Sequence, residues 1–550
     1  MKKLLTSIAI ASAITAAFST RASDSNLTLS RNLTILNSVV KELATAYVDT
    51  IDSRKLMEFA IDAMLYQGTD PYTEYYPWDD QDEILSISEG SYAGIGSAIV
   101  KRGDAVYITA PYWNSPARDA GLLPGDRIIA VDGDTVTAST DVGDVSRRLR
   151  GQAGTTVRVD IVRPYADDSL RTVEIVRRDI TVNPLPYYGR LDNGVGYILL
   201  EQFNGSSARS VKAAVADLLA GGDLPGLIID LRGNGGGLLE GAVQIAGLFV
   251  PKGTEIVRTR GRDALNERIY KTTENPLAPE LPLAILIDGG TASASEILAG
   301  SMQDLDRAVI AGARSYGKGL VQTTRPLPFN GMLKLTTGRY YIPSGRLIQA
   351  IDYSHRNAEG DAVRVPDSLT HAFTTRAGRT VRDGGGITPD TVMAIPTVSR
   401  FAYTLANEFR PFDYATRHYS RRPEAPAVDA VLVDSAMFVE FKAMVDSTGF
   451  KYDRPYLSTI DALRNAVRDD GFLDDAISAQ LDTLSAMLHQ DLDRDFETHR
   501  DEIMKLLDTE LANRYFSEGD RVRHRLPADS VVSATADLLL DNNKYRSILR

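Results

Sequence analysis

The sequence predicts a multidomain α/β protein. Its 550 residues exceed what one hydrophobic core normally accommodates. Strand and helix patterns alternate from about residue 185 to 350, short β-branched runs precede them, and a mainly helical pattern follows them. We therefore expect five segments: a leader at 1–22, a helical segment at 23–84, a small β-rich domain at 85–180, an α/β domain at 181–395 and a mainly helical region at 396–550.

The leader has the features of a cleavable secretory signal peptide. Lys2 and Lys3 precede an apolar stretch from Leu4 to Phe18, and small residues follow near Ala22. A membrane anchor is the alternative, but about 15 apolar residues are fewer than the roughly 20 that span a bilayer. We therefore expect an exported, periplasmic or equivalent location.

Composition excludes several classes of function. The net charge of −12 opposes a general attraction to nucleic-acid phosphates. The chain contains no cysteine, which excludes disulfides, thiolate metal sites, a cysteine nucleophile and a lipid-modified N-terminal cysteine. Hydrophobic residues at 43% and charged residues at 24% are typical of a globular protein.

The first two segments contain clear periodic patterns. Apolar residues recur at helical spacing from Leu33 to Tyr47, and Ser53 is expected to cap a second helix that ends at Gly68. The β-rich segment predicts two short helices, Pro116–Ala120 and one ending near Leu149. It also predicts strands at Ser97–Val100, Val106–Thr109, Arg127–Val131 and Val157–Val162.

The α/β segment predicts buried strands, each leading toward a helix. The expected strands are Val195–Leu200, Gly226–Leu231 and Leu283–Asp288, and the expected helices are Ser207–Leu219, Leu238–Phe249 and one starting near Ser293. The region after 395 interleaves charged and apolar residues and contains no functional motif.

A glycine loop in the β-rich segment is a candidate carboxylate site, although a Gly-x-Gly is also an ordinary turn. The longer run from Ser115 to Gly133 (SPARDAGLLPGDRIIAVDG) resembles the core of PDZ domains. That resemblance implies that a peptide adds as an extra strand with its C-terminus at the loop. The implied peptide-binding residues are Tyr92, Ala93, Gly94, Ile95 and Gly96.

Three motifs mark the α/β segment. The run from Asp230 to Gly237 (DLRGNGGG) follows a strand and presents unpaired N–H groups, but it lacks the ending of a phosphate loop. Ser293 opens the next helix, where Ser293 and Glu296 also fit a capping box. Lys318 lies between two glycines, a position that a solvated surface lysine can also occupy.

The histidines limit the choice of catalytic base. All six lie beyond the segment that carries these motifs, so a Ser-His-Asp triad would need a distant histidine to fold back. If Ser293 is activated locally, a lysine is the available base. The histidines also lack the spacing of a metal site, and we expect no metal or cofactor.

Together the motifs resemble those of the C-terminal processing (tail-specific) peptidase family, over roughly residues 30–395. The resemblance implies a ClpP/crotonase-like peptidase core with a PDZ domain and flanking helical segments. By this resemblance Ser293 would be the nucleophile, Lys318, 25 positions later, would be the base, and Gln322 would orient Lys318. On a straight strand Lys318 and Gln322 would lie about 13 Å apart, so a contact between them requires the strand to bend. The oxyanion hole would use Ala294 and either Gly235 or Gly236. Thr291 replaces a serine that is common in the family.

The predicted function is that of an exported serine endopeptidase that recognises protein tails and forms an acyl-enzyme. Its expected partners are proteins or peptides with accessible C-termini. A homo-oligomer, an adaptor protein and peripheral association with a membrane stay open. An inactive PDZ scaffold is the alternative function, and the PDZ module and leader disfavour a crotonase-like acyl-CoA enzyme.

Overall fold

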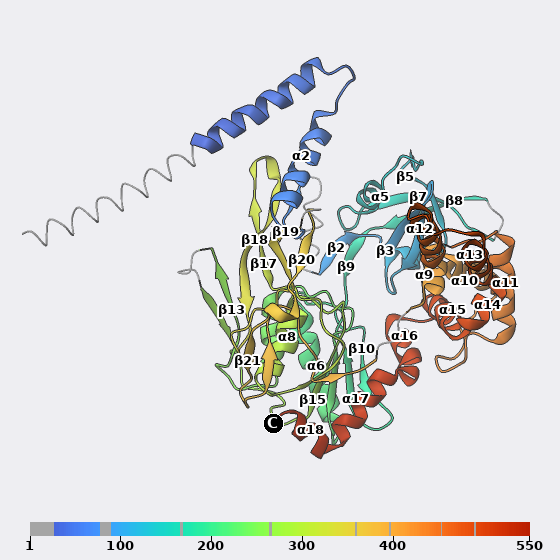
Figure 1. The fold of residues 1–550 in the computed structure, drawn as a ribbon. Helices are drawn as coiled ribbons and strands as arrows, with labels where there is room; N and C mark the ends of the chain where they lie inside the picture. Colours follow the sequence, from blue (N-terminus) through green and yellow to red (C-terminus); the bar gives the residue numbers. More distant parts are fainter. Residues whose placement is uncertain are drawn as a thin grey trace, which may run out of the picture. The chain divides into compact units, whose positions relative to one another are not determined.

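The computed structural model describes residues 27–77, 90–165, 169–262, 267–357, 360–394, 398–452, 454–488 and 491–550 (Figure 1). The predicted signal peptide at 1–22 lies outside these residues. The chain forms two compact units. The smaller holds the described residues before position 79 together with Gln322–Thr337, and the larger holds the described residues from 90 to Val321 and from Gly338 to Arg550.

The smaller unit contains the two predicted N-terminal helices. The first covers 27–46 and the second is α2, Ser53–Gly68. The predicted cap at Ser53 is wrong: Asp52 is the N-cap, because its carboxylate accepts hydrogen bonds from the N–H groups of Arg54 and Lys55. In the same unit β1 (Glu74–Tyr76) pairs antiparallel with the first residues of β18 (Met332–Tyr341).

The larger unit begins with a small β-domain that contains the strands and both helices predicted for it. Its antiparallel sheet has the order β3-β4-β5-β7-β8, with β6 paired to β5, and β2 pairs separately with β9. Strand β3 is an edge strand of this sheet. The elements are β2 Ser91–Gly94, β3 Ser97–Arg102, β4 Ala105–Pro111, α4 Pro116–Asp119, β5 Arg127–Val131, β6 Asp134–Thr135, α5 Val142–Leu149, β7 Thr156–Val162, β8 Leu170–Val176 and β9 Arg178–Thr181.

The α/β domain is built on a six-stranded sheet with the order β10-β11-β12-β15-β16-β23. Strand β10 is antiparallel to β11, and the other neighbours are parallel. Because parallel strands place their carboxyl ends at one edge, the loops after β12 and β15 emerge side by side. The strands are β10 Tyr187–Arg190, β11 Gly196–Leu199, β12 Leu227–Asp230, β15 Leu283–Ile287, β16 Val309–Gly312 and β23 Thr391–Val392.

Two separate hydrophobic clusters cover the two faces of this sheet. One contains α6 (Ser207–Ala220), α7 (Leu239–Ala246) and α8 (Ala294–Asp304), which come from the α/β segment itself. The other contains α17 (Ser530–Leu540) and α18 (Asn542–Ile548), which come from the far end of the chain. The last two helices thus pack on the six-stranded sheet and not in the helical bundle.

Further strands complete the α/β domain. β13 (Glu255–Gly261) pairs with β14 (Arg268–Lys271) and with the last residues of β18. Strand β17 (Leu320–Pro326), like β18, has residues in both units. Two hairpins follow: β19 Ile351–Arg356 with β20 Ala362–Arg364, and β21 Ala372–Thr374 with β22 Thr380–Arg382.

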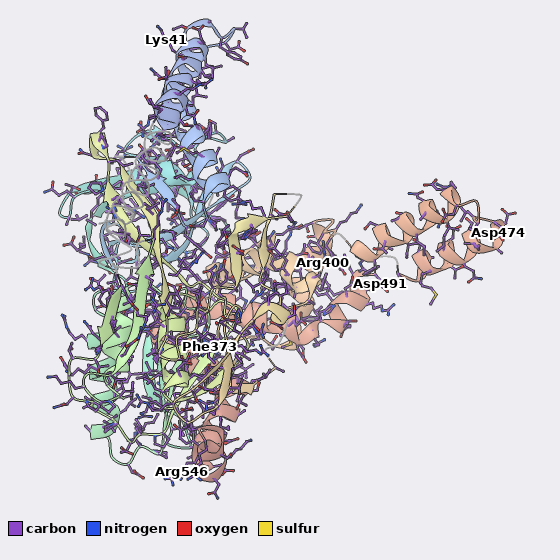
Figure 2. The ribbon with its side chains drawn as sticks, turned by 60° about the vertical axis from the view of Figure 1, so that its left-hand side comes forward. Lys41, Phe373, Arg400, Asp474, Asp491 and Arg546 are labelled. Atoms are coloured by element: carbon purple, nitrogen blue, oxygen red, sulfur yellow. The ribbon has the colours of Figure 1, made fainter. Side chains whose placement is uncertain are left out.

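The helical region is a bundle with an aromatic core that includes Phe401, Phe438, Phe441 and Phe496. Helices α12 and α13 form a hairpin with Asp474 at its turn (Figure 2). None of the described helices is both long and apolar enough to cross a bilayer. The bundle and hairpin helices are α9 Arg400–Asn407, α10 Arg410–Arg421, α11 Ser435–Ser447, α12 Pro455–Asp469, α13 Asp475–Met487, α14 Leu492–Thr498, α15 Arg500–Tyr515 and α16 Glu518–Arg525.

Candidate active site

Ser293 occupies a strained turn between β15 and α8. Its backbone has φ 56° and ψ −117°, and positive φ is uncommon for a residue with a side chain. Such a conformation persists only where the surroundings hold it, and it recurs at functional sites. A serine on a tight strand-to-helix turn is also the arrangement of a nucleophile elbow, in which the hydroxyl is exposed at the edge of the sheet.

Glu296 lies one helical turn after Ser293 and is fully buried. Its Oε2 accepts a hydrogen bond from the N–H of Ser293 (2.9 Å), as in a capping box, and a second from the N–H of Lys318 (2.9 Å). Its Oε1 accepts from the N–H of Gly317 (2.7 Å) and from the hydroxyl of Ser315. A single carboxylate therefore joins the serine turn to the lysine loop.

The pKa of Glu296 reflects two opposing effects. Burial favours the neutral acid and raises the pKa to about 7, while the four hydrogen bonds favour the carboxylate and act against the rise. Above that pH the carboxylate can accept all four bonds. Protonation converts one acceptor position into a donor and weakens the connection.

Tyr340 makes a second connection between the same two segments. Its hydroxyl lies 2.6 Å from the carbonyl oxygen of Lys318 and 3.2 Å from that of Ser293, close enough to donate to either. The side chain of Lys318 is half-buried, and Gly317 and Gly319 pack against the backbone of Ala350 and Gln349. The structure thus brings the predicted nucleophile and the predicted base segment together through Glu296 and Tyr340.

The glycine loop after β12 is attached to the serine turn by side chains. Asp288 accepts hydrogen bonds from the N–H groups of Gly233 (2.9 Å) and Thr291 (3.1 Å), and the Thr291 hydroxyl donates to the carbonyl of Leu231 (2.8 Å). The carbonyl of Asn234 accepts from the N–H of Ala292 (3.0 Å). The threonine at position 291 therefore cross-links the two loops.

The two candidate oxyanion glycines differ in their bonding. The N–H of Gly236 donates to the side chain of Asn234 (2.9 Å), whereas the N–H groups of Gly235 and Ala294 have no acceptor in the described part of the chain. A Cβ on Gly236 would lie 2.8 Å from Cβ of Ser293, which places this loop directly against the serine. The first N–H groups of a helix are unpaired by geometry, and Ala294 is the first residue of α8.

Gln322 lies on β17 in the smaller unit. Its amide Nε2 donates to the hydroxyl of Thr336 (3.2 Å), which in turn donates to Asp70 (3.1 Å). Its predicted role as the partner of Lys318 stays a prediction.

The glycine loop of the β-domain has its carbonyls bonded and two of its N–H groups unpaired. The carbonyls of Ala93, Ile95 and Gly96 accept from the N–H groups of Gly151, Ala117 and Tyr112. The N–H groups of Ile95 and Gly96 have no acceptor among the described residues. Tyr92 and Gly94 belong to β2, and Gly96 leads into the edge strand β3. The loop therefore presents donors at the start of an unpaired strand edge.

Sequence reasoning missed several residues of this site. The sequence indicates Glu296 only as half of a capping box, although its burial within α8 is consistent with the apolar residues around it. The motifs give no role to the side chains of Asp288, Asn234 and Tyr340. Asp288 had one signal, since it directly follows a buried strand at the edge where the loops converge.

Comparison with known proteins identifies the domains. A profile described as "Peptidase family S41" matches residues 194–355, and a "PDZ domain" profile matches 107–163. A profile described as "Probable PDZ-protease, C-terminal helical domain" matches 401–539. The predicted fold class, an α/β multidomain protein with a PDZ domain and a helical region, is confirmed.

Two named relatives agree with these assignments. The chain is 37% identical over 324 residues to a "Carboxy-terminal-processing protease" of Bartonella bacilliformis, covering 58% of this chain and 73% of the relative. It is 32% identical over 326 residues to a "Probable CtpA-like serine protease" of Staphylococcus aureus, covering 59% of this chain and 64% of the relative. The solved "Photosystem II D1 C-terminal processing protease" is 30% identical, with a TM-score of 0.34, over 60% of this chain and 90% of that one. The chain belongs to the carboxy-terminal-processing protease family and is a serine peptidase.

Proposed function

We propose that this protein is an exported endopeptidase in which Ser293 and Lys318 form a catalytic dyad. The observation that carries the proposal is the buried carboxylate of Glu296, which holds the backbone of Ser293 and the backbone of Lys318 at once. A purely structural capping glutamate would need only the first of these bonds. The alternative of an inactive PDZ scaffold is not favoured, since the relatives are named as proteases.

In the proposed reaction, neutral Lys318 accepts the proton of the Ser293 hydroxyl while its oxygen attacks the peptide carbonyl. The resulting oxyanion is stabilised by the N–H of Ala294 and by one N–H of the glycine loop, and the bonding of Gly236 to Asn234 favours Gly235 for this role. Lys318 then protonates the departing amine, which leaves an acyl-enzyme. Water attacks this ester and gives a proton to Lys318, which then passes it to the departing Ser293 oxygen, so the acid product is released and both residues are regenerated. Gln322 would orient the lysine.

The PDZ domain would capture the substrate's C-terminus. The unpaired N–H groups of Ile95 and Gly96 suit a terminal carboxylate, and the free edge of β3 suits an added peptide strand. The expected partners are therefore proteins or peptides with accessible C-termini. The proposal of export is based on the sequence of the leader at 1–22. A homo-oligomer, an adaptor protein and peripheral association with a membrane are further candidate interactions.

The dyad is tested with two substitutions and a control. Ser293→Ala and Lys318→Arg should each lower kcat for a short peptide to the level of the buffer blank while both proteins remain folded, because arginine keeps the charge but does not accept a proton. Lys212→Arg, at an exposed lysine paired with Glu274, should be unaffected. Turnover by folded Lys318→Arg comparable to that of Lys212→Arg would remove the lysine from the mechanism.

Tail recognition is tested separately by amidating the C-terminus of a tail peptide. Amidation removes the charge that the loop would bind, so affinity should fall by about tenfold or more. Unchanged affinity would contradict the role of the 92–96 loop without affecting the dyad.

A further inference from the structure

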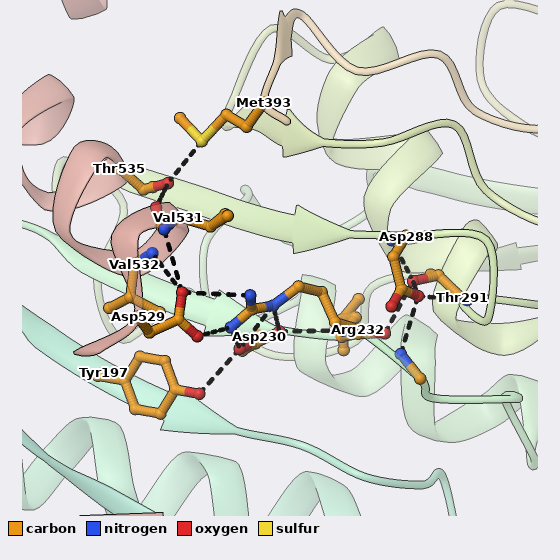
Figure 3. Close-up of polar contacts among 12 residues, drawn as sticks. Tyr197, Asp230, Arg232, Asp288, Thr291, Met393, Asp529, Val531, Val532 and Thr535 are labelled. Atoms are coloured by element: carbon orange, nitrogen blue, oxygen red, sulfur yellow. Dashed lines mark hydrogen bonds and ion pairs between the residues drawn. The ribbon is translucent and has the colours of Figure 1, made fainter. Parts of the chain in front are cut away.

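An ion-pair network connects the glycine loop to the far end of the chain (Figure 3). Arg232 donates through Nη2 to Asp230 (2.6 Å) and to Asp529 (2.8 Å). Asp230 ends β12 and is buried, and it also accepts a hydrogen bond from the hydroxyl of Tyr197 (2.8 Å). Arg232 is thus held between one carboxylate of the sheet and one carboxylate that lies 297 positions later.

Asp529 is itself fixed in place. It is the N-cap of α17, where Oδ1 accepts hydrogen bonds from the N–H groups of Val531 and Val532 (both 3.1 Å). Val531, Val532 and Leu539 bury α17 against one face of the six-stranded sheet. The carboxylate is therefore presented to Arg232 from a rigid support.

The arginine leads directly into the loop that packs against Ser293. Gly233 follows it and donates to Asp288, and Gly236 lies against Ser293 three residues further on. Asp230 holds one edge of the guanidinium through Nε and Nη2, and Asp529 holds its outer end through Nη2, so Arg232 connects the end of β12 to α17. The position of Arg232 thus affects the backbone that leads to the proposed oxyanion donors.

We propose that Asp529 is a positioning residue of the peptidase site, acting through Arg232 on the Gly233–Gly236 loop. The inference rests on the proposed function, because it takes Ser293 as the nucleophile of that site. It makes the C-terminal helices part of the catalytic scaffold. A role in catalysis is expected to change kcat more than KM, because Asp529 would act through Arg232 on the loop that carries the proposed oxyanion donor.

The test separates the ion pair from the helix cap. Asn is as good an N-cap as Asp, so Asp529→Asn keeps the cap of α17 but removes the charge that binds Arg232. Asp541→Asn is the matched control, because Asp541 caps α18 in the same segment through the N–H groups of Asn543 and Lys544. Asp529→Glu restores the charge with a longer side chain. Ser293→Ala serves as the reference for loss of the nucleophile.

We expect Asp529→Asn in the full chain to lower kcat for a short fluorogenic peptide at least tenfold with KM within twofold, and Asp529→Glu to recover part of the loss. Asp541→Asn should keep a kcat close to that of the unsubstituted chain, and thermal unfolding should be similar for both Asn variants. The inference is overturned if Asp529→Asn has normal kcat or if Asp541→Asn loses as much. If Ser293→Ala remains active, the proposed function fails; if it is inactive and Asp529→Asn is normal, only the positioning role fails.

Discussion

The chain contains two glycine-rich loops that present backbone N–H groups, and they are held in different ways. The loop at 92–96 is held by its own carbonyls, which accept hydrogen bonds from nearby segments of the PDZ domain. The loop at 233–237 has similar backbone bonds, from the N–H groups of Ala292 and Phe203, and is held in addition by the side chains of Asp288, Asn234 and Ser295. Two loops of similar composition therefore differ in the hydrogen bonds that hold them in place.

The difference corresponds to what each loop is proposed to bind. A terminal carboxylate arrives already charged and needs two donors beside a strand edge. An oxyanion develops only during the reaction, so its donors must be in place beforehand, in fixed relation to Ser293. Side-chain anchors from several elements provide that relation, at the cost of making the loop sensitive to distant substitutions.

Among substitutions that compare the two loops, Gly236→Ala should have the largest effect. Gly236 has φ +100°, and a Cβ there would lie 2.7 Å from the carbonyl oxygen of Ala292, so the loop must move away from Ser293. We expect kcat to fall about 10²–10³-fold, the range for loss of an oxyanion donor. Gly235→Ala is the control, because its Cβ meets no atom within 4 Å and its N–H is retained. Equal losses in peptide hydrolysis assays would contradict the distinction between the two glycines.

Glu296→Gln should remove a pH dependence of stability between pH 4.5 and 8. Burial raises the folded-state pKa from the ordinary 4.5 to about 7, so between these values the folded protein binds more protons than the unfolded one. The resulting contribution to the free energy of unfolding is about 3 kcal/mol. It is fully present below pH 4.5 and is lost as the pH rises through 7. Urea unfolding from pH 4.5 to 8 should show this decline for the native chain and not for Glu296→Gln. A decline that persists in Glu296→Gln would assign it to another group.

Gly96→Ala should weaken tail binding while leaving the peptidase loop unchanged. Gly96 has φ +72°, and a Cβ would lie 2.5 Å from Cβ of Ser115, so the carboxylate loop must shift. We expect about tenfold weaker binding of a tail peptide by fluorescence anisotropy, with normal kcat for a short peptide. Gly103→Ala adds a Cβ at positive φ with no atom within 4 Å, and separates backbone strain from steric displacement. Matching losses in both variants would argue against a specific role of the loop.

The smallest effect is expected from Ser295→Ala. Its buried hydroxyl donates to the carbonyl of Asn234 (2.9 Å), which also accepts a bond from Ala292, so the acceptor stays satisfied. Stability should fall by about 1 kcal/mol and kcat should change only a few-fold. Thermal unfolding and peptide hydrolysis check both values. Complete inactivation would move the nucleophile from Ser293 to Ser295.

The sequence predicted those features that depend on neighbouring residues. Strand β12 and helix α6 follow from local apolar runs, and no observed end of either element differs from the predicted one by more than one residue. The capping-box spacing also placed the carboxylate of Glu296 beside the N–H of Ser293. Periodicity does not predict that the N–H of Lys318 also donates to this carboxylate, because that hydrogen bond depends on how β17 and the loop before it pack.

The least predictable contact is the pairing of Arg232 with Asp529. Within its own segment, Asp529 has only the pattern of a helix cap, and nothing nearby distinguishes it from Asp541 or Asp474, which cap other helices. Its ion pair with Arg232 can be recognised only once α17 is known to pack on the sheet. Long-range side-chain partners of this kind require the tertiary structure.

The position of α17 and α18 on the sheet also has a consequence for the timing of synthesis. The last strands of the sheet emerge from the ribosome well before residues 530–548, and at roughly 5–20 residues per second the interval lasts on the order of ten seconds or more. During that interval the apolar face formed by residues such as Ile228 and Leu286 has no covering helix. We therefore expect the nascent chain to expose this face to chaperones until translation has passed the segment that carries Asp529.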